Sequence, residues 1–178
     1  MKLCLSVSIA LAMLTTTDAC AAPRLGSEYT LYIDPGFSLS QQDVIVTVAA
    51  DWEEHVPVHF FPVVAKCSGV NDGIICVHAA TREQIKKVNP AASNYTRYIN
   101  GAGHRGDTGG WFGRDGGECF IDAGQPDIYF QPSVAHELGH AMGLEHQPDK
   151  GTVMYPGLDG ISAWVTTEDA EQWRAIRQ

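Results

Sequence analysis

Positive charge is scarce in this sequence. Its 178 residues include 12 lysines and arginines against 21 aspartates and glutamates, which leaves a formal net charge of −9. An acidic surface argues against nucleic acid or anionic membranes as the main partner, because both carry negative charge. The chain also has no internal repeat, no low-complexity tract and no C-x-x-C pair. A repeat architecture and a structural zinc site built on thiolates are therefore not expected.

Long hydrophobic runs are absent except at the N-terminus, so we expect no transmembrane segment. Lys2 is followed by an apolar run over residues 3–14 and then by the small-residue exit Ala19-Cys20-Ala21. This pattern predicts a secretory signal peptide over residues 1–21, and residues 22–178 would form a single, monomeric domain. A lipoprotein signal with Cys20 as the lipidated residue is the alternative. The protein would accordingly be secreted or periplasmic, with or without a lipid anchor.

Export makes the few cysteines interpretable. Cys67 and Cys76 flank the turn sequence Asn71-Asp72-Gly73, which predicts neighbouring strands joined by a disulfide. Cys119 is left over, either free or bridged to Cys20 if that residue is retained in the mature protein.

Hydrophobic periodicity predicts an α+β domain. An alternating pattern marks a first strand, and an apolar stripe at helical spacing marks a helix that Ser40 would cap. Further strands and helices follow, with an irregular stretch over residues 89–108. The expected order is strand 28–34, helix 40–56, strands 58–67 and 73–80, a short helical turn 82–88, strands 109–114 and 117–122, a helix after residues 131–133, and a final helix capped by Thr167.

The segment from His136 to His146 carries the chemistry. His136 and His140 are four residues apart, so on a helix both imidazoles project from one face. Gly143 lies one turn later, where a residue tolerant of positive φ can reverse the chain and return His146 as a third ligand. Three imidazoles leave one tetrahedral position open, which is typical of a catalytic zinc. Glu137 lies beside the first histidine and is positioned to act as a general base.

These residues form the pattern HExxHxxGxxH, and the segment resembles the zinc signature of the metzincins. The eight-residue step from His146 to Met154, followed by Tyr155 and Pro156, is similar to the matrixin branch, the matrix-metalloproteinase-like metzincins. The resemblance implies a twisted, mixed five-stranded sheet with about three helices. It also implies an active-site helix followed by a Met-turn and a C-terminal helix. Met154 would lie beneath the histidines as an apolar floor, without binding the metal.

A weaker resemblance extends upstream of the signature. Residues 109–113 resemble the glycine-led edge strand that borders the substrate cleft in matrixins. Gly110, Trp111 and Phe112 would then bind an extended peptide, and Tyr155 and Pro156 would line the same cleft. Phe120 stands where animal matrixins carry a histidine for a second, structural zinc. We therefore expect one catalytic zinc, with calcium near Asp122 as a weaker inference.

The function implied is that of a secreted zinc-dependent endopeptidase. One alternative is a zinc amide hydrolase that acts on cell-wall peptides. Another is a catalytically silent, zinc-dependent binding protein, although binding alone would not require a base such as Glu137 beside the open metal position.

Overall fold

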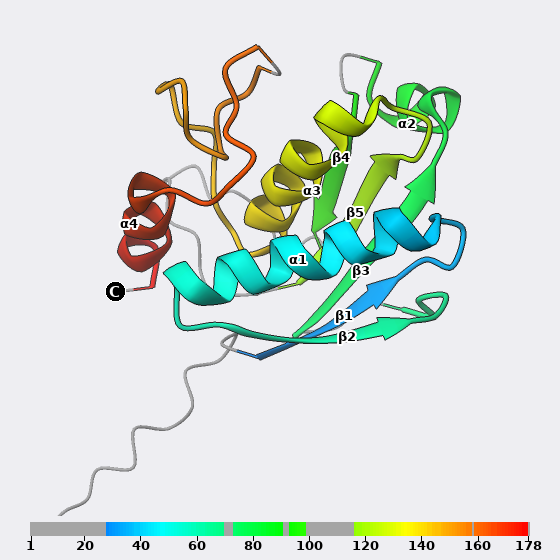
Figure 1. The fold of residues 1–178 in the computed structure, drawn as a ribbon, viewed down its shortest axis with the longest axis horizontal. Coiled ribbons are helices and arrows are strands. Elements are labelled where there is room, and N and C mark those ends of the chain that lie inside the picture. Colours follow the sequence, from blue (N-terminus) through cyan, green and yellow to red (C-terminus); the bar gives the residue numbers. More distant parts are fainter. Residues whose placement is uncertain (1–27, 70–72, 91–92, 99–115, 158, 178) are drawn as a thin grey trace, which may run out of the picture.

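The computed structural model describes residues 28–69, 73–90, 93–98, 116–157 and 159–177. These residues form five strands and four helices (Figure 1). In chain order they are β1 (Glu28–Ile33), α1 (Leu39–His55), β2 (His59–Val64), β3 (Ile74–Ala80), α2 (Arg82–Val88), β4 (Tyr95–Tyr98), β5 (Gly117–Asp122), α3 (Asp127–Ala141) and α4 (Thr167–Ala175).

The strands form one mixed sheet in the order β2-β1-β3-β5-β4. Strands β2, β1, β3 and β5 run parallel to one another, and β4 pairs antiparallel with β5 at the edge of the sheet. The predicted five-stranded mixed sheet is therefore confirmed. The described part of the chain has four helices where about three were expected, because the helical turn predicted at residues 82–88 is a capped helix, α2.

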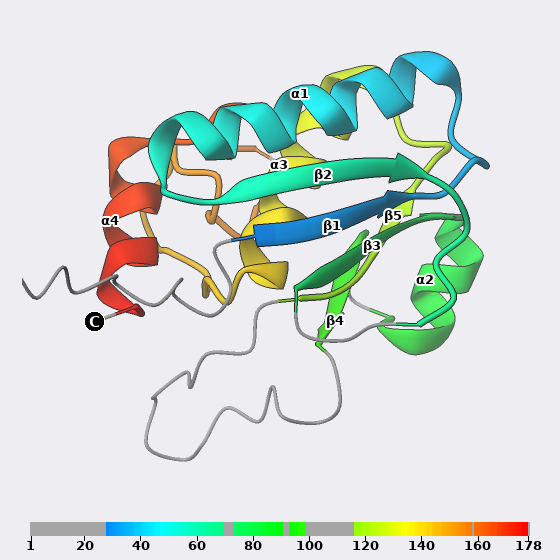
Figure 2. The same ribbon diagram turned by 90° about the horizontal axis from the view of Figure 1, so that it is seen from below.

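One face of the sheet packs against α1 and α3, which cross it on the same side (Figures 1 and 2). Alternate residues of the central strands point into this layer, and Tyr29, Leu31 and Ile33 of β1 are fully buried. From α1, Trp52 is also fully buried. Its indole Nε1–H donates to the carbonyl of Ala135 in α3 at 3.2 Å. The helix with the histidines is thus fixed to the core by both apolar packing and a buried hydrogen bond.

Three helices, α1, α3 and α4, begin earlier than the sequence predicts. The N-cap of α1 is Ser38, whose hydroxyl accepts from the backbone N–H of Gln41 in a capping box, so the predicted cap at Ser40 is wrong. Helix α3 begins at Asp127 and contains Pro132 in its interior. The proline removes only the hydrogen bond to Ile128, which lies in the exposed first turn, so the helix tolerates it.

The segment after α2 also differs from the prediction. Residues 95–98 form β4, although residues 89–108 were expected to be irregular because of their turn-forming punctuation. Tyr95, Thr96 and Tyr98 are residue types that favour strands, and pairing with β5 completes the strand.

The predicted disulfide between Cys67 and Cys76 is present, with a Cα–Cα distance of 5.8 Å. Its two cysteines do not join neighbouring strands, because β1 lies between β2 and β3. The bond instead ties the segment after β2 to the middle of β3. Cys119 is buried and does not take part in this disulfide.

Candidate metal centre

Helix α3 presents two histidines on one face. The side chains of His136 and His140 lie one turn apart, with ring centroids 4.6 Å from each other and ring planes at 87°. Both residues are part-buried, at the end of the helix nearest its C-terminus. The sequence spacing alone predicted this arrangement.

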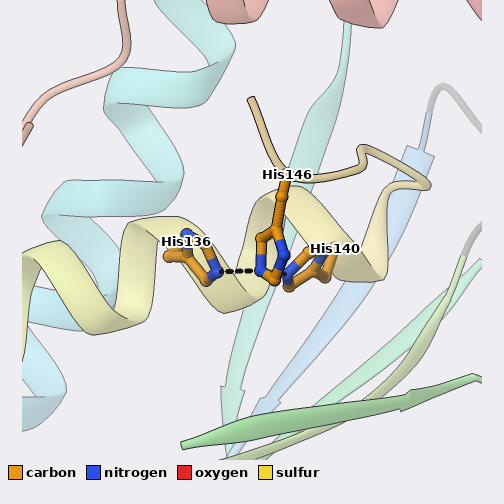
Figure 3. A group of neighbouring side chains, drawn as sticks. All are labelled: His136, His140 and His146. Atoms are coloured by element: carbon orange, nitrogen blue, oxygen red, sulfur yellow. Dashed lines mark hydrogen bonds between the residues drawn. The ribbon is translucent and has the colours of Figure 1, made fainter. Parts of the chain in front are cut away.

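The chain reverses at Gly143 through a C-cap built from two backbone hydrogen bonds. The N–H of Gly143 donates to the carbonyl of His140 at 2.8 Å, and the N–H of Leu144 donates to that of Gly139 at 3.0 Å. This is the Schellman pattern, and it requires a residue of positive φ, which Gly143 supplies at 96°. The turn brings His146 back over the two helix-borne histidines (Figure 3).

The three imidazoles converge through their Nε2 atoms. The Nε2 of His146 lies 3.2 Å from that of His136 and 3.2 Å from that of His140. Two nitrogens bound tetrahedrally to zinc at about 2.0–2.1 Å are about 3.3–3.4 Å apart, so this spacing suits zinc ligands. Within the described ranges, this is the one group of three histidines, cysteines or acidic residues close enough to hold a metal ion.

Backbone carbonyls orient the two helix-borne rings. The Nδ1 of His136 lies 2.7 Å from the carbonyl oxygen of Val153, and the Nδ1 of His140 lies 2.8 Å from that of Leu144. A carbonyl can only accept, so in the neutral ring Nδ1 carries the proton. Each Nε2 then presents its lone pair to the shared centre, as metal-binding histidines do.

Burial keeps these rings neutral. It lowers the pKa of His136 to about 4 and that of His140 to about 3, and it also lowers the pKa of His146. A neutral His146 has one proton, which can serve only one of its two contacts to the other Nε2 atoms. A cation at the centre would satisfy all three nitrogens, so the donor set fits a metal better than it fits hydrogen bonds among the histidines.

Met154 lies directly against the helix that carries the histidines. It is fully buried, and a Cβ atom placed on Gly139 would overlap its Sδ and lie 3.2 Å from Cζ2 of Trp52. Gly139 therefore allows the methionine thioether and the indole to reach the backbone of α3 between the two histidines. Met154 therefore packs against the turn of α3 that separates His136 from His140, and its role as a Met-turn stays a prediction.

Asp169, on α4, holds the turn that contains Met154. This carboxylate is fully buried and accepts from the backbone N–H groups of Val153 at 2.9 Å and Met154 at 3.2 Å. It also accepts from the hydroxyl of Thr166 at 2.7 Å. The cap predicted at Thr167 is wrong, because the N-cap of α4 is Thr166 and Asp169 completes its capping box. Nothing in the sequence indicates that the same carboxylate reaches the turn beneath the histidines.

Glu137 is only 5% exposed, on the turn of α3 between the two histidines. Its backbone carbonyl accepts from the thiol of Cys119 at 3.4 Å, so this β5 residue packs against the same turn of α3. The predicted base therefore belongs to the interior of the domain.

Of the residues predicted to line the substrate cleft, the structure describes only the two that follow Met154. Tyr155 is half-buried and Pro156 is exposed, immediately after Met154. Gly110, Trp111 and Phe112 lie outside the described residues. The antiparallel edge strand next to β5 is β4 in the part of the chain that the structure describes. The carboxylate of Asp122 accepts from the N–H of Gly124 at 3.0 Å and lies 3.9 Å from Arg82, and calcium there stays a prediction.

Comparisons with known proteins agree with the motif. A family model described as matrixin matches residues 40–176. Human matrilysin (Homo sapiens) is 30% identical over 105 residues, which cover 59% of this chain and 37% of matrilysin. The chain thus spans little more than a third of that relative's length.

Among solved structures, archaemetzincin from Methanopyrus kandleri is similar with a TM-score of 0.48 and 17% identity, covering 86% of this chain and 97% of that one. Myroilysin gives a TM-score of 0.40 and 18% identity, covering 68% of this chain and 50% of that one.

Proposed function

Because this chain belongs to the matrixin family, we propose that it is a secreted zinc-dependent endopeptidase in which His136, His140 and His146 bind the metal and Glu137 is the general base. The observation that carries the proposal is the convergence of three Nε2 atoms, two of them 3.2 Å from the third. Three protein ligands leave a position open for water and substrate.

The histidines supply neutral donors, and the protein's own hydrogen bonds keep them in place. The carbonyls of Val153 and Leu144 hold two of the rings with Nε2 facing the centre. A zinc ion bound there would supply Lewis acidity, which lowers the pKa of water toward about 7. The carboxylate of Glu137 would accept a proton from the attacking water and deliver it to the leaving amine of the cleaved peptide bond.

An extended peptide would bind along the outer edge of β4. In the part of the chain that the structure describes, this strand is the antiparallel edge of the sheet, next to β5, and it runs beside α3 (Figure 1). An unpaired strand edge offers backbone N–H and C=O groups to a peptide laid beside it. Tyr155 and Pro156 would line the same cleft after the Met-turn. Peptide contacts at Gly110, Trp111 and Phe112, which lie outside the described residues, stay a prediction beside this one.

Residues 1–21 would serve as the signal for export, either cleaved after Ala21 or processed to a lipid anchor at Cys20. Residues 22–178 would then be the catalytic domain, acting as a monomer outside the cytoplasm. No helix in the described ranges is long and apolar enough to cross a membrane.

Replacement of Glu137 tests the assignment of the base. Glu137→Gln keeps the shape of the side chain and removes its basicity. We expect zinc content to stay near one ion per chain while hydrolysis of an unstructured protein falls by about 10²–10⁴-fold, the usual contribution of a general base. Glu171→Gln, which alters an exposed carboxylate on α4 away from the histidines, is the matched control and should retain activity. Full activity in Glu137→Gln would refute the role of Glu137.

The alternative functions are separated by substrate. The wild-type protein should cleave an unstructured protein in a chelator-sensitive reaction and leave purified cell wall intact. Release of wall peptides without proteolysis would favour an amide hydrolase. Zinc binding with no hydrolysis of either substrate would favour a binding protein.

A further inference from the structure

A chain of buried amide and hydroxyl groups connects β4 to the helix that carries the histidines. Asn94, immediately before β4, donates from Nδ2 to the hydroxyl oxygen of Ser133 in α3 at 3.0 Å. Its Oδ1 accepts from the backbone N–H of Asp122, the last residue of β5, at 2.7 Å. The Ser133 hydroxyl then donates to Oε1 of Gln125 at 3.0 Å. The side chain of Asn94 thus forms hydrogen bonds to both α3 and β5.

These contacts lie in the interior of the domain. Ser133 is 3% exposed, Asp122 is 6% exposed and Gln125 is 8% exposed. The loss of one partner in such a place leaves a buried polar group unsatisfied, which is unfavourable. The network therefore favours a single position of the short strand that follows Asn94.

The position that Asn94 fixes lies beside the metal centre. Ser133 is three residues before His136, so it lies about one turn away on α3. At the other end of β4, Tyr98 pairs with Gly117, and the N–H of the adjacent Gly116 donates to the carbonyl of Ala141 at 3.0 Å. Strand β4 therefore runs alongside α3 from the level of Ser133 to that of Ala141, past both helix-borne histidines.

A strand of four residues at the edge of a sheet has few backbone hydrogen bonds of its own. Among the described residues its only partner strand is β5. Short edge segments of this kind open locally at low free-energy cost unless something else holds them. The side chain of Asn94 supplies two hydrogen bonds at the end of β4 nearest Ser133, in addition to the strand pairing.

We propose that Asn94 is a positioning residue that holds the edge strand β4 at a fixed height against α3, and that it thereby sets how tightly an extended peptide binds beside the metal. The proposal rests on the proposed peptidase function and on peptide binding along β4. Asn94 itself touches neither the metal ligands nor Glu137 in any described contact, so it acts through the strand.

Loss of the Asn94 hydrogen bonds should change KM for a peptide substrate and the rate of amide hydrogen exchange in β4. In Asn94→Ala both hydrogen bonds are lost, and we expect KM for a peptide substrate to rise at least fivefold while kcat stays within twofold. Zinc content should stay near one per chain. Amide hydrogen exchange at residues 95–98 should accelerate by at least tenfold, with the middle of α3 still protected. Ser133→Ala should produce the same pattern, and the double variant should be less than additive because both changes break one network.

Two further variants separate positioning from general stability. Asn94→Asp keeps an acceptor for the Asp122 N–H and should partly restore KM, and it also serves if Asn94→Ala does not fold. Glu54→Ala, which alters an exposed side chain of α1 away from the network, should leave KM and exchange unchanged. An unchanged KM in a folded Asn94 variant would overturn the proposal, as would a loss of kcat in proportion to the unfolded fraction. Unaltered exchange at residues 95–98 would overturn it even if the wild-type protein proves to have no peptidase activity.

Discussion

At the scale of single residues, the metal centre depends on a glycine with no space for a side chain. Gly139 lies between the two helix-borne histidines, in contact with the buried Met154 and close to the indole of Trp52. A methyl group at this position would have to displace the thioether, and the surrounding core is filled by fully buried side chains. The histidines can occupy their positions because the helix between them has no side chain on that face.

Gly139→Ala should therefore destabilise the protein, although alanine favours helices. Overpacking of a filled core costs about 1–3 kcal/mol, which exceeds the gain of about 1 kcal/mol in helix propensity. Urea unfolding of the metal-free protein measures the effect. The double variant Gly139→Ala/Met154→Ala should be less destabilised than the sum of the two single variants, since the methionine side chain is the obstacle.

Gly69→Ala is the control for this substitution, because nothing lies within 4 Å of a Cβ at that position. Its free energy of unfolding should match that of the wild type. Equal stability of Gly139→Ala and Gly69→Ala would show that the contact with Met154 is not restrictive.

The buried histidines lead to a second prediction, which concerns how the stability of the metal-free protein depends on pH. In the folded, metal-free protein the pKa of His136 is lowered to about 4 and that of His140 to about 3, whereas an unfolded histidine titrates near 6.5. Between these values the unfolded chain binds more protons, so stability should fall as the pH drops below about 6.5. His140→Gln should show a weaker pH dependence in urea unfolding. An identical dependence in that variant would contradict the assignment of the buried site.

The residues of the site were predictable only where the pattern is local. His136, His140, Gly143 and His146 lie within eleven residues, so helical spacing and one turn are enough to bring them together. Asp169 and Trp52 come from other helices and support this centre through hydrogen bonds to the backbone around it. Their roles depend on tertiary packing, which the spacing of residues along the chain does not encode.

At the scale of elements, the end of α3 is the feature that completes the site. The helix must stop at a defined residue so that the chain can turn and return His146. Gly143 at φ 96° closes this turn with two backbone hydrogen bonds. Leu144, the next residue, then places its carbonyl 2.8 Å from Nδ1 of His140.

Gly143→Ala should weaken both folding and metal binding. A Cβ at positive φ costs about 1 kcal/mol or more, and any relaxation of the turn moves His146 and the Leu144 carbonyl together. We expect zinc affinity, measured by competition with a chelator, to fall at least tenfold. Gly139 is unsuitable as a control, but Gly69→Ala should bind zinc normally. Unchanged zinc affinity in Gly143→Ala would show that the cap does not determine the position of His146.

The elements themselves were predicted well where the hydrophobic period is regular. Strands β1 and β3, the body of α1 and the terminal helix α4 follow their expected ranges within a few residues. The neighbours of each strand were not predictable, since the turn at Asn71-Asp72-Gly73 suggested a hairpin. A parallel sheet is ordered by crossover connections, and here α1 carries the chain from β1 to β2 on one side before β3 joins β1 on the other.

At the scale of the whole molecule, three helices converge on one metal centre. Helix α3 carries two ligands, α1 supports it through Trp52, and α4 holds the turn beneath it through Asp169. Near the C-terminus, Arg177 donates to the carbonyl of Met142 at 3.1 Å and to the hydroxyl of Tyr29 at 3.2 Å. The end of α3 is thereby tied to the first strand of the sheet. The metal site and the hydrophobic core are therefore one cooperative structure.

The central claim is that three imidazoles bind a single zinc ion and leave its fourth coordination position open. Zinc X-ray absorption of the full chain loaded with one equivalent of zinc tests this directly. The structure predicts three imidazole nitrogens at about 2.0–2.1 Å and one further oxygen ligand, with no sulfur. A sulfur at about 2.3 Å, a fourth protein ligand that closes the site, or fewer than three imidazoles would contradict the account.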